Sequence, residues 1–116
     1  MSVNEGLPLY LVSRLEQRFD LSSMTVGVLG MAFKEESDDR RDSLSYKLKR
    51  ILRFRAGHVL CHDPYVTEDE ELVPLDMILE RSDLLVVATP HQVYRQLAPA
   101  VPLIDIWSAC PHGERP

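Results

Sequence analysis

The heptapeptide MTVGVLG, Met24–Gly30, decides the fold of this chain. It is short, β-branched and nearly all apolar, and such continuous apolarity is typical of a parallel strand covered on both faces. It runs into the polar stretch GMAFKEESDDRRDS, Gly30–Ser43, after which a helical pattern starts at Leu44. A strand, a polar loop and a helix in this order indicate an α/β fold, in which ligands bind at the carboxyl ends of the strands.

Strands and helices alternate along the rest of the chain. We expect further strands at His58–Asp63, Asp83–Pro90 and Pro102–Trp107, and helices at Leu7–Phe19, from Leu44 to a stop at Gly57, at Pro74–Ser82 and at His91–Leu97. This pattern predicts a three-layer, half-Rossmann-like α/β domain with a parallel sheet of about four or five strands, in the order 2-1-3-4. The loop after Gly30 and the sequence Thr89-Pro90-His91 then lie at the topological switch point between the first and third strands.

Composition restricts the classes of protein. The 116 residues, 45% hydrophobic and 27% charged, are typical of one globular domain. The net charge of -5 disfavours a general nucleic-acid binder. Cys61 and Cys110 are too few for a disulfide framework and indicate reduced thiols in a cytoplasmic protein. No apolar run reaches the ~18 residues of a membrane span, and the start MSVNEG does not resemble a signal peptide, so we expect no membrane partner.

The loop after the first strand does not match a dinucleotide-binding loop. If Gly30 is the first glycine of G-x-G-x-x-G, Ala32 and Glu35 stand where the other two belong. Asp63, the acid at the end of the second strand, comes well beyond the expected ~20 positions. The side chain of Phe33 would also obstruct a pyrophosphate. We therefore do not expect this loop to hold a dinucleotide by itself.

Acids outnumber bases between Lys34 and Asp42, so the loop is not a simple anion trap either. In one interpretation it is a solvated loop whose acids favour the helix N-terminus and pair with the arginines. In the other, the acids orient Lys34 and Arg41 toward a charged ligand. The residue types alone leave both interpretations open.

The stretch GMAFKEESDDRRDSLSYKL resembles the start of the C-terminal, UDP-binding domain of the UDP-glucose/GDP-mannose dehydrogenase family, the nucleotide-sugar 6-dehydrogenases. The family's G-x-A-F-K and D-D-x-R-x-S motifs are matched in register by Gly30, Ala32, Phe33, Lys34, Asp38, Asp39, Arg41 and Ser43. The resemblance continues through DPY (Asp63–Tyr65), LLVVATPH (Leu84–His91) and DIW (Asp105–Trp107). VNEGLP (Val3–Pro8) is similar to the segment that ends the family's central helical region. Nearly the whole chain is covered.

The resemblance implies two parts and three site residues. Residues 1–20 would be the end of the central helical region with a leading helix, and residues 21–116 the UDP-sugar-binding Rossmann-like domain. Phe33 and Lys34 would contact the nucleotide-sugar, preferably a UDP-sugar. Arg41 would reach toward the phosphates of NAD, which is bound mainly by the N-terminal domain of the same enzyme. As weaker expectations, Asp39 would orient Arg41 and Ser43 would help to start the helix.

Enzymes of this family oxidise the 6-hydroxyl of a sugar to a uronic acid in two NAD-dependent steps through a catalytic cysteine, and they form homo-oligomers. The glycine-rich NAD loop and that cysteine belong to the N-terminal half. Cys61 and Cys110 lack glycine-rich surroundings, so we interpret them as structural or incidental and predict no catalytic residue. The chain alone is expected to be inactive. A stand-alone nucleotide-binding or dimerisation module remains the alternative, and GDP in place of UDP stays open, as does the identity of the sugar.

Other motifs have plainer interpretations. His58 and His62 would share one face of a strand while Cys61 and Asp63 share the other, so no metal site is predicted, and Asp63 is expected to turn the chain at DPY. His91 is expected to start a helix rather than to act as a base, although the family-like Thr-x-His keeps the base open. The basic residues of the second helix are expected to form a solvated face rather than a nucleic-acid surface; they are Lys47, Lys49, Arg50, Arg53 and Arg55. The first helix would pack on the sheet or form an oligomer seam.

Overall fold

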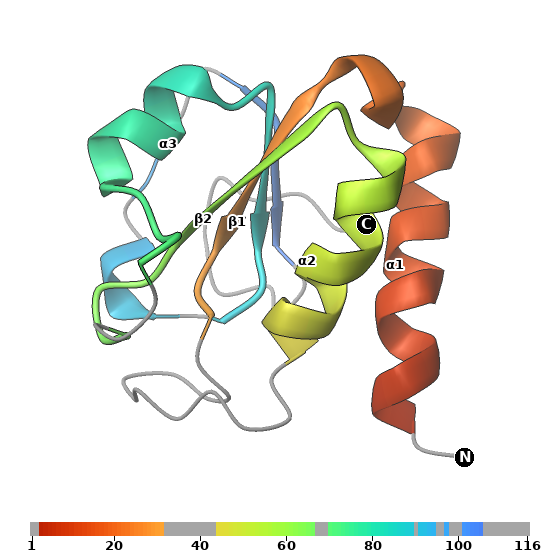
Figure 1. The fold of residues 1–116 in the computed structure, drawn as a ribbon, viewed down its shortest axis with the longest axis horizontal. Coiled ribbons are helices and arrows are strands. Elements are labelled where there is room, and N and C mark those ends of the chain that lie inside the picture. The colour runs from red at the N-terminus through yellow and green to blue at the C-terminus, as the bar shows by residue number, and fades with distance from the viewer. Residues whose placement is uncertain are drawn as a thin grey trace.

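The structure is a computed structural model, and it describes residues 3–31, 44–66, 70–89, 91–94, 97 and 101–105. Four parallel strands form one sheet in the order β2-β1-β3-β4 (Figure 1). They are β1 (Thr25–Leu29), β2 (His58–His62), β3 (Leu84–Val87) and β4 (Leu103–Asp105). The predicted strand order and the Rossmann-like fold class are confirmed. The carboxyl ends of the strands meet at the lower edge of the sheet in Figure 1.

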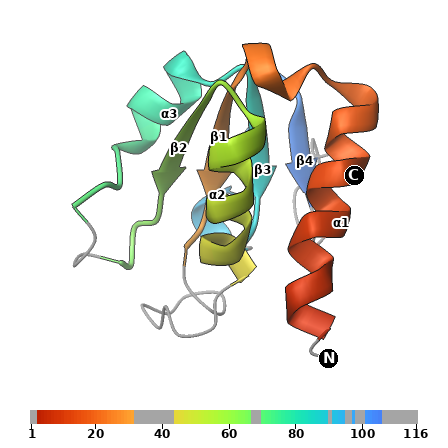
Figure 2. The ribbon, with the colours of Figure 1, turned by 45° about the vertical axis from the view of Figure 1, so that its right-hand side comes forward.

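Helices cover both faces of the sheet. α1 (Val3–Arg18) and α2 (Leu44–Arg55) lie on one face, and α3 (Leu75–Arg81) and the short 3-10 helix η2 (Gln92–Tyr94) lie on the other (Figure 2). A second 3-10 helix, η1 (Leu21–Ser23), leads into β1. The result is the three-layer arrangement that alternating strands and helices predict.

The core consists of two hydrophobic clusters, one on each face of the sheet, and they explain why the central strands are almost wholly apolar. In β1, Val26 and Val28 pack into the cluster under α1 and α2, whereas Leu29 packs into the cluster under α3. Successive side chains of a strand point to opposite faces, and both faces are covered, so the buried positions of β1 after Thr25 are all apolar residues or glycine. At Gly27 a Cβ would lie 2.8 Å from Cγ1 of Ile78, so the glycine allows α3 to approach the sheet closely.

Some element boundaries differ from the predictions. α1 begins at Val3 instead of Leu7, because a helix continues through Pro8 at the cost of one backbone hydrogen bond, and residues 3–6 show no apolar period that would reveal it. The helix predicted at His91–Leu97 is the 3-10 helix η2 among the described residues. α1 packs against α2 and buries Leu11, Val12 and Leu15 in this chain's own core. Among the described residues, no helix is both long enough and apolar enough to cross a membrane.

Candidate functional site

The carboxyl end of β1 is pressed against the end of β3. Gly30 has a φ of 93°, a conformation that side-chain-bearing residues rarely adopt, and its N–H donates a hydrogen bond of 2.8 Å to the carbonyl of His62. A Cβ on Gly30 would lie 2.4 Å from the Cβ of Thr89 and 2.7 Å from its carbonyl oxygen. The space beside the β1 turn is therefore occupied by the backbone that follows β3.

Asp63, directly after β2, accepts hydrogen bonds from three segments with one fully buried carboxylate. Oδ1 accepts from the N–H of Tyr65 at 2.7 Å and from that of Val66 at 3.3 Å, which confirms the predicted turn at DPY. Oδ2 accepts from the N–H of Met31 at 2.7 Å and from Nε2 of His91 at 2.8 Å. Burial alone would raise the pKa of the Asp63 carboxyl, but the hydrogen bonds from His91, Met31 and Tyr65 outweigh it, so the pKa is lower than usual and the group stays ionised.

His91 lies at a helix start, as predicted, but it is also fully buried. Its carbonyl accepts a hydrogen bond of 3.0 Å from the N–H of Tyr94, which begins η2. Its ring packs between Tyr65, at 4.7 Å between ring centroids, and Tyr94, at 5.7 Å. A ring enclosed on both sides and bonded to a carboxylate is placed to hold that carboxylate rather than to take a proton from a substrate.

A second polar pair, formed by His62 and Tyr94 of η2, lies beside the pair formed by Asp63 and His91. The hydroxyl of Tyr94 donates a 3.1 Å hydrogen bond to the carbonyl of His62 and lies 2.8 Å from Nδ1 of the same residue. Since the hydroxyl has one proton, Nδ1 of His62 is the donor in the shorter contact. Burial lowers the pKa of the His62 imidazole and raises the pKa of the Tyr94 hydroxyl, so both groups remain neutral near pH 7.

The first turn of α2 is also linked to the end of β3. The hydroxyls of Ser45 and Thr89 are both buried and lie 3.3 Å apart. Met31 precedes the connection of residues 32–43, and Ser45 is the second residue of the helix that follows it. Both ends of this connection are therefore attached to residues that follow the neighbouring strands, through Asp63 at one end and Thr89 at the other.

The three predicted site residues, Phe33, Lys34 and Arg41, lie outside the described residues, as do Asp39 and Ser43. What the structure places is the frame around them, namely the end of β1 and the start of α2. The bond between Asp63 and His91 was not predicted from the sequence. Both residues follow strands that flank β1, and this shared position was the available signal.

The described residues also place one of the two cysteines and a polar hollow. Cys61 is buried within β2, and Cys110 lies outside the described residues. In the described part of the chain, no three histidines, cysteines or carboxylates are grouped to hold a metal ion. A polar hollow of about 380 Å³ opens at the opposite end of the molecule, between the end of α1 and Arg55, and Arg55 is paired with Glu16 across 2.7 Å.

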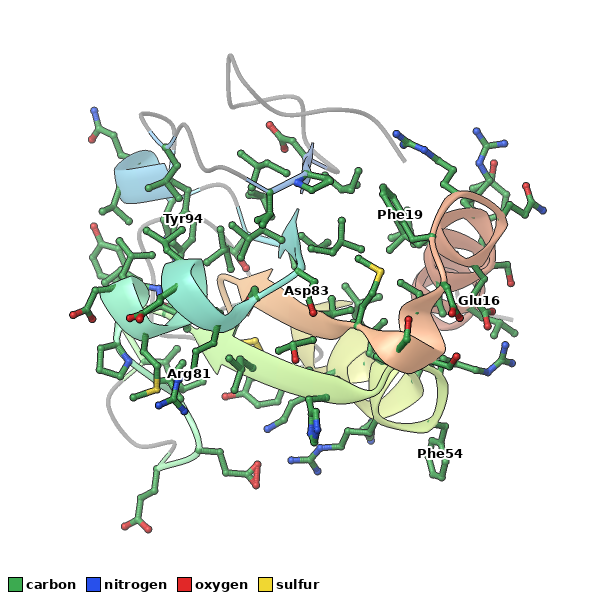
Figure 3. All side chains as sticks on the ribbon, turned by 90° about the horizontal axis from the view of Figure 1, so that it is seen from above. Glu16, Phe19, Phe54, Arg81, Asp83 and Tyr94 are labelled. Atoms are coloured by element: carbon green, nitrogen blue, oxygen red, sulfur yellow. The ribbon has the colours of Figure 1, made fainter. Side chains whose placement is uncertain are left out.

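The basic face of α2 is not the fully solvated face that was predicted. The Lys49 side chain is buried, and its Nζ lies 2.8 Å from Glu71, which also binds Arg53 at 2.7 Å. The prediction was wrong for Lys49 because a helical period places residues on faces but does not show which loop covers them. Phe54, in contrast, projects away from α2 into solvent (Figure 3).

Comparison with known proteins identifies close similarities along most of the chain. The family model described as "UDP-glucose/GDP-mannose dehydrogenase family, UDP binding domain" matches residues 27–110. A UDP-glucose 6-dehydrogenase of Haloferax volcanii is 39% identical over 69 residues, which is 60% of this chain and 16% of that protein. An NDP-N-acetyl-D-galactosaminuronic acid dehydrogenase of Ralstonia solanacearum is 30% identical over 105 residues, covering 82% of this chain and 24% of that protein.

The fold is shared with solved structures as well. A UDP-glucose dehydrogenase from Pyrobaculum islandicum superposes with a TM-score of 0.81 and 28% identity, over 97% of this chain and 29% of that chain. The chain spans at most about a quarter of the length of the curated relatives named here. The matched residues include Gly27–Leu29 of β1, the connection of residues 32–43, and both Asp63 and His91.

Proposed function

The chain belongs to the UDP-glucose/GDP-mannose dehydrogenase family, as its UDP binding domain, and from this we propose that it binds the UDP part of a nucleotide sugar at the carboxyl edge of its sheet. The observation that carries the proposal is the continuous match of residues 27–110, which includes the G-x-A-F-K and D-D-x-R-x-S motifs. The fold supports it, because the connection that bears these motifs starts at the carboxyl end of β1, beside the switch point.

Within this connection Phe33 and Lys34 have chemically distinct tasks. Phe33 offers an aromatic face to the nucleoside, since bases and ribose pack well on aromatic rings. Lys34 supplies a point charge for the diphosphate. The described network around Asp63 is internally hydrogen bonded and is closed over by Tyr65, so it supports the site and does not itself face the ligand.

The described residues do not fit a cradle for NAD. A pyrophosphate needs open space against the backbone of the first turn, and at Gly30 that space is filled by Thr89. We therefore propose that NAD is held mainly by another domain of the enzyme and that this chain contributes Arg41 to its phosphates. In the complete enzyme, NAD would accept the hydride that leaves carbon C6 of the sugar in each of two oxidations, which together convert the 6-hydroxyl group to the carboxylate of a uronic acid. The catalytic cysteine would lie outside this chain, and the chain alone would not turn over.

Calorimetric titration of the chain with UDP, UDP-glucose, GDP and NAD tests the proposal. We expect UDP and UDP-glucose to bind, GDP to bind more weakly, and NAD to give no measurable heat. Lys34→Ala should weaken UDP binding about tenfold, as expected for the loss of a charged hydrogen bond of about 1.4 kcal/mol. Arg50→Ala removes the same charge from the exposed side of α2 and is the matched control.

Binding of UDP that is indifferent to Lys34→Ala would contradict the site. Absence of binding by every nucleotide would contradict nucleotide binding by this chain. The runner-up function, a stand-alone module without a catalytic partner, has a separate test. If co-expression with the N-terminal half of a relative never produces NADH from UDP-glucose and NAD, while UDP still binds, the stand-alone module is favoured.

A further inference from the structure

A buried carboxylate joins the three strand ends that surround the proposed nucleotide site. Oδ2 of Asp63, after β2, holds the N–H of Met31, after β1, at 2.7 Å. The same oxygen holds Nε2 of His91, after β3, at 2.8 Å. Since β1 lies between β2 and β3 in the sheet, the pair spans the end of the central strand.

We propose that Asp63 and His91 are positioning residues for the nucleotide site, which act by fixing the backbone at Met31 and thereby the placement of Phe33 and Lys34. This inference rests on the proposed UDP binding. Phe33 and Lys34 are the second and third residues after Met31, and consecutive Cα atoms are ~3.8 Å apart, so a displacement at Met31 is carried directly into both side chains. Binding groups must be held to about 0.5 Å, so the anchor of this segment affects affinity.

The two carboxylate oxygens of Asp63 have different partners, and this difference distinguishes a positioning residue from a residue that only forms a turn. Oδ1 alone receives the N–H groups of Tyr65 and Val66, which is all that the DPY turn requires. An asparagine would serve such a turn equally well. The second oxygen and the ionised state are used for Met31 and His91. Burying a carboxylate costs free energy unless it is fully hydrogen bonded, so a turn alone would not account for a buried, ionised Asp63.

The other end of the segment is held in a related way. His91 donates its backbone N–H to the carbonyl of Thr89 at 2.8 Å, and the Thr89 hydroxyl lies 3.3 Å from that of Ser45 in the first turn of α2. The residues that follow β3 therefore contact both ends of the connection of residues 32–43. A displacement of His91 would disturb the start of this connection through Asp63 and its end through Thr89.

The chain offers a matched control at the opposite end of β1. Asp83 accepts a hydrogen bond of 2.9 Å from the N–H of Thr25 at the amino end of the same strand, and it is labelled in Figure 3, which views the molecule from that end. Asp63→Asn and Asp83→Asn make the same chemical change to a carboxylate that binds a backbone N–H of β1. In Asp63→Asn the amide keeps one acceptor for the turn and turns an N–H₂ group toward the N–H of Met31, so two donors face each other.

Calorimetric titration with UDP, combined with a double-mutant cycle, tests the inference. Asp63→Asn should weaken UDP binding roughly tenfold or more, because small misplacements of binding groups are costly, whereas Asp83→Asn should change it less than twofold. In the Lys34→Ala background the effect of Asp63→Asn should shrink, because the part of that effect that acts through Lys34 is already lost. His91→Gln, which retains an N–H donor, should bind UDP better than His91→Leu.

Hydrogen exchange gives a readout that does not depend on the ligand. The amide of Met31 should exchange faster in Asp63→Asn and His91→Leu than in the parent chain, while the amide of Thr25 should not. Unchanged Met31 exchange, or additive effects in the cycle, or equal losses from Asp63→Asn and Asp83→Asn, would overturn the inference and leave UDP binding standing. If the parent chain does not bind UDP, the proposed function is wrong, and faster Met31 exchange would still establish the anchor.

Discussion

Gly30 and Thr89 touch across the ends of β1 and β3, so closely that a Cβ on Gly30 would lie 2.4 Å from the Cβ of Thr89. This contact has two consequences. It fills the crevice in which open α/β sheets often hold a dinucleotide, and it brings His91 within reach of Asp63. The closed crevice and the buried pair are thus parts of one arrangement.

Gly30→Ala tests this contact. The new methyl group would meet Thr89 backbone atoms, and the φ of 93° is strained for alanine, so we expect the free energy of unfolding to fall by about 2 kcal/mol or more. Urea unfolding measures the change. Gly57→Ala is the comparison, since its Cβ would lie 3.0 Å from the nearest atom and its φ is not positive. Equal losses in the two variants would argue against a special contact at Gly30.

The stability of the chain should depend on pH in two stages. Burial lowers the pKa of His62, so its contribution is fully present above the unfolded pKa of about 6.5 and declines as pH falls through the folded pKa. The pKa of Asp63 is also lowered, so its contribution is present above about pH 3.9 and is lost as pH falls further. Urea unfolding between pH 2 and 7 measures both stages.

Asp63→Asn separates the two stages. The difference in unfolding free energy between the parent chain and this variant should be constant above about pH 4 and should narrow below it, because only the parent loses a carboxylate there. The decline that begins near pH 6.5 should be common to both proteins. A difference that stays constant down to pH 2 would show that folding does not lower the pKa of the Asp63 carboxyl.

Tyr94→Phe should remove a buried hydrogen-bonded hydroxyl and leave the ring in place. The hydroxyl contacts both the carbonyl and the ring of His62, so we expect a loss of about 1 kcal/mol of stability. Tyr10→Phe removes a hydroxyl from a residue that is 57% exposed, and its effect should stay within about 0.5 kcal/mol. Thermal unfolding measures the loss of stability in both variants, and indistinguishable melting temperatures would contradict the hydrogen bonds between the Tyr94 hydroxyl and His62.

The pair formed by Lys49 and Glu71 should respond unequally to removal of each partner. Hydrogen bonds from Lys49 and Arg53 lower the pKa of the Glu71 carboxyl. Glu71→Gln leaves the buried ammonium of Lys49 without its anion and should destabilise the chain. Lys49→Met replaces the ammonium with an apolar group of similar size and should be nearly neutral or stabilising. Chemical denaturation of both variants gives the comparison, and a larger loss in Lys49→Met would reverse this interpretation.

Much of the fold was accessible from the sequence because both faces of the sheet are covered. β1 is nearly and β3 wholly apolar, and this pattern predicts central parallel strands without knowledge of any contact. The start of α1 could not be found, because residues 3–6 have no apolar period. The burial of Lys49 could not be found either, since it depends on where the segment that bears Glu71 crosses α2.

The features of the candidate site could also be predicted only in part from the sequence. Phe33, Lys34 and Arg41 came from a motif and stay predictions, because they lie outside the described residues. Asp63 was correctly predicted to turn the chain, since an aspartate forms such turns locally. Its bond to His91 joins residues that are far apart in the sequence, and only the strand order brings them together.

The order of the strands also constrains how the chain is made. β1 precedes both of its sheet neighbours in the sequence, and β3, which closes its second edge, starts at Leu84. During synthesis on the ribosome, the central strand β1 therefore has an open edge until β3 has emerged, and open apolar edges pair readily with other chains. Truncations that end before β3 should aggregate rather than fold, and a chaperone that shields this strand would act before the nucleotide site exists.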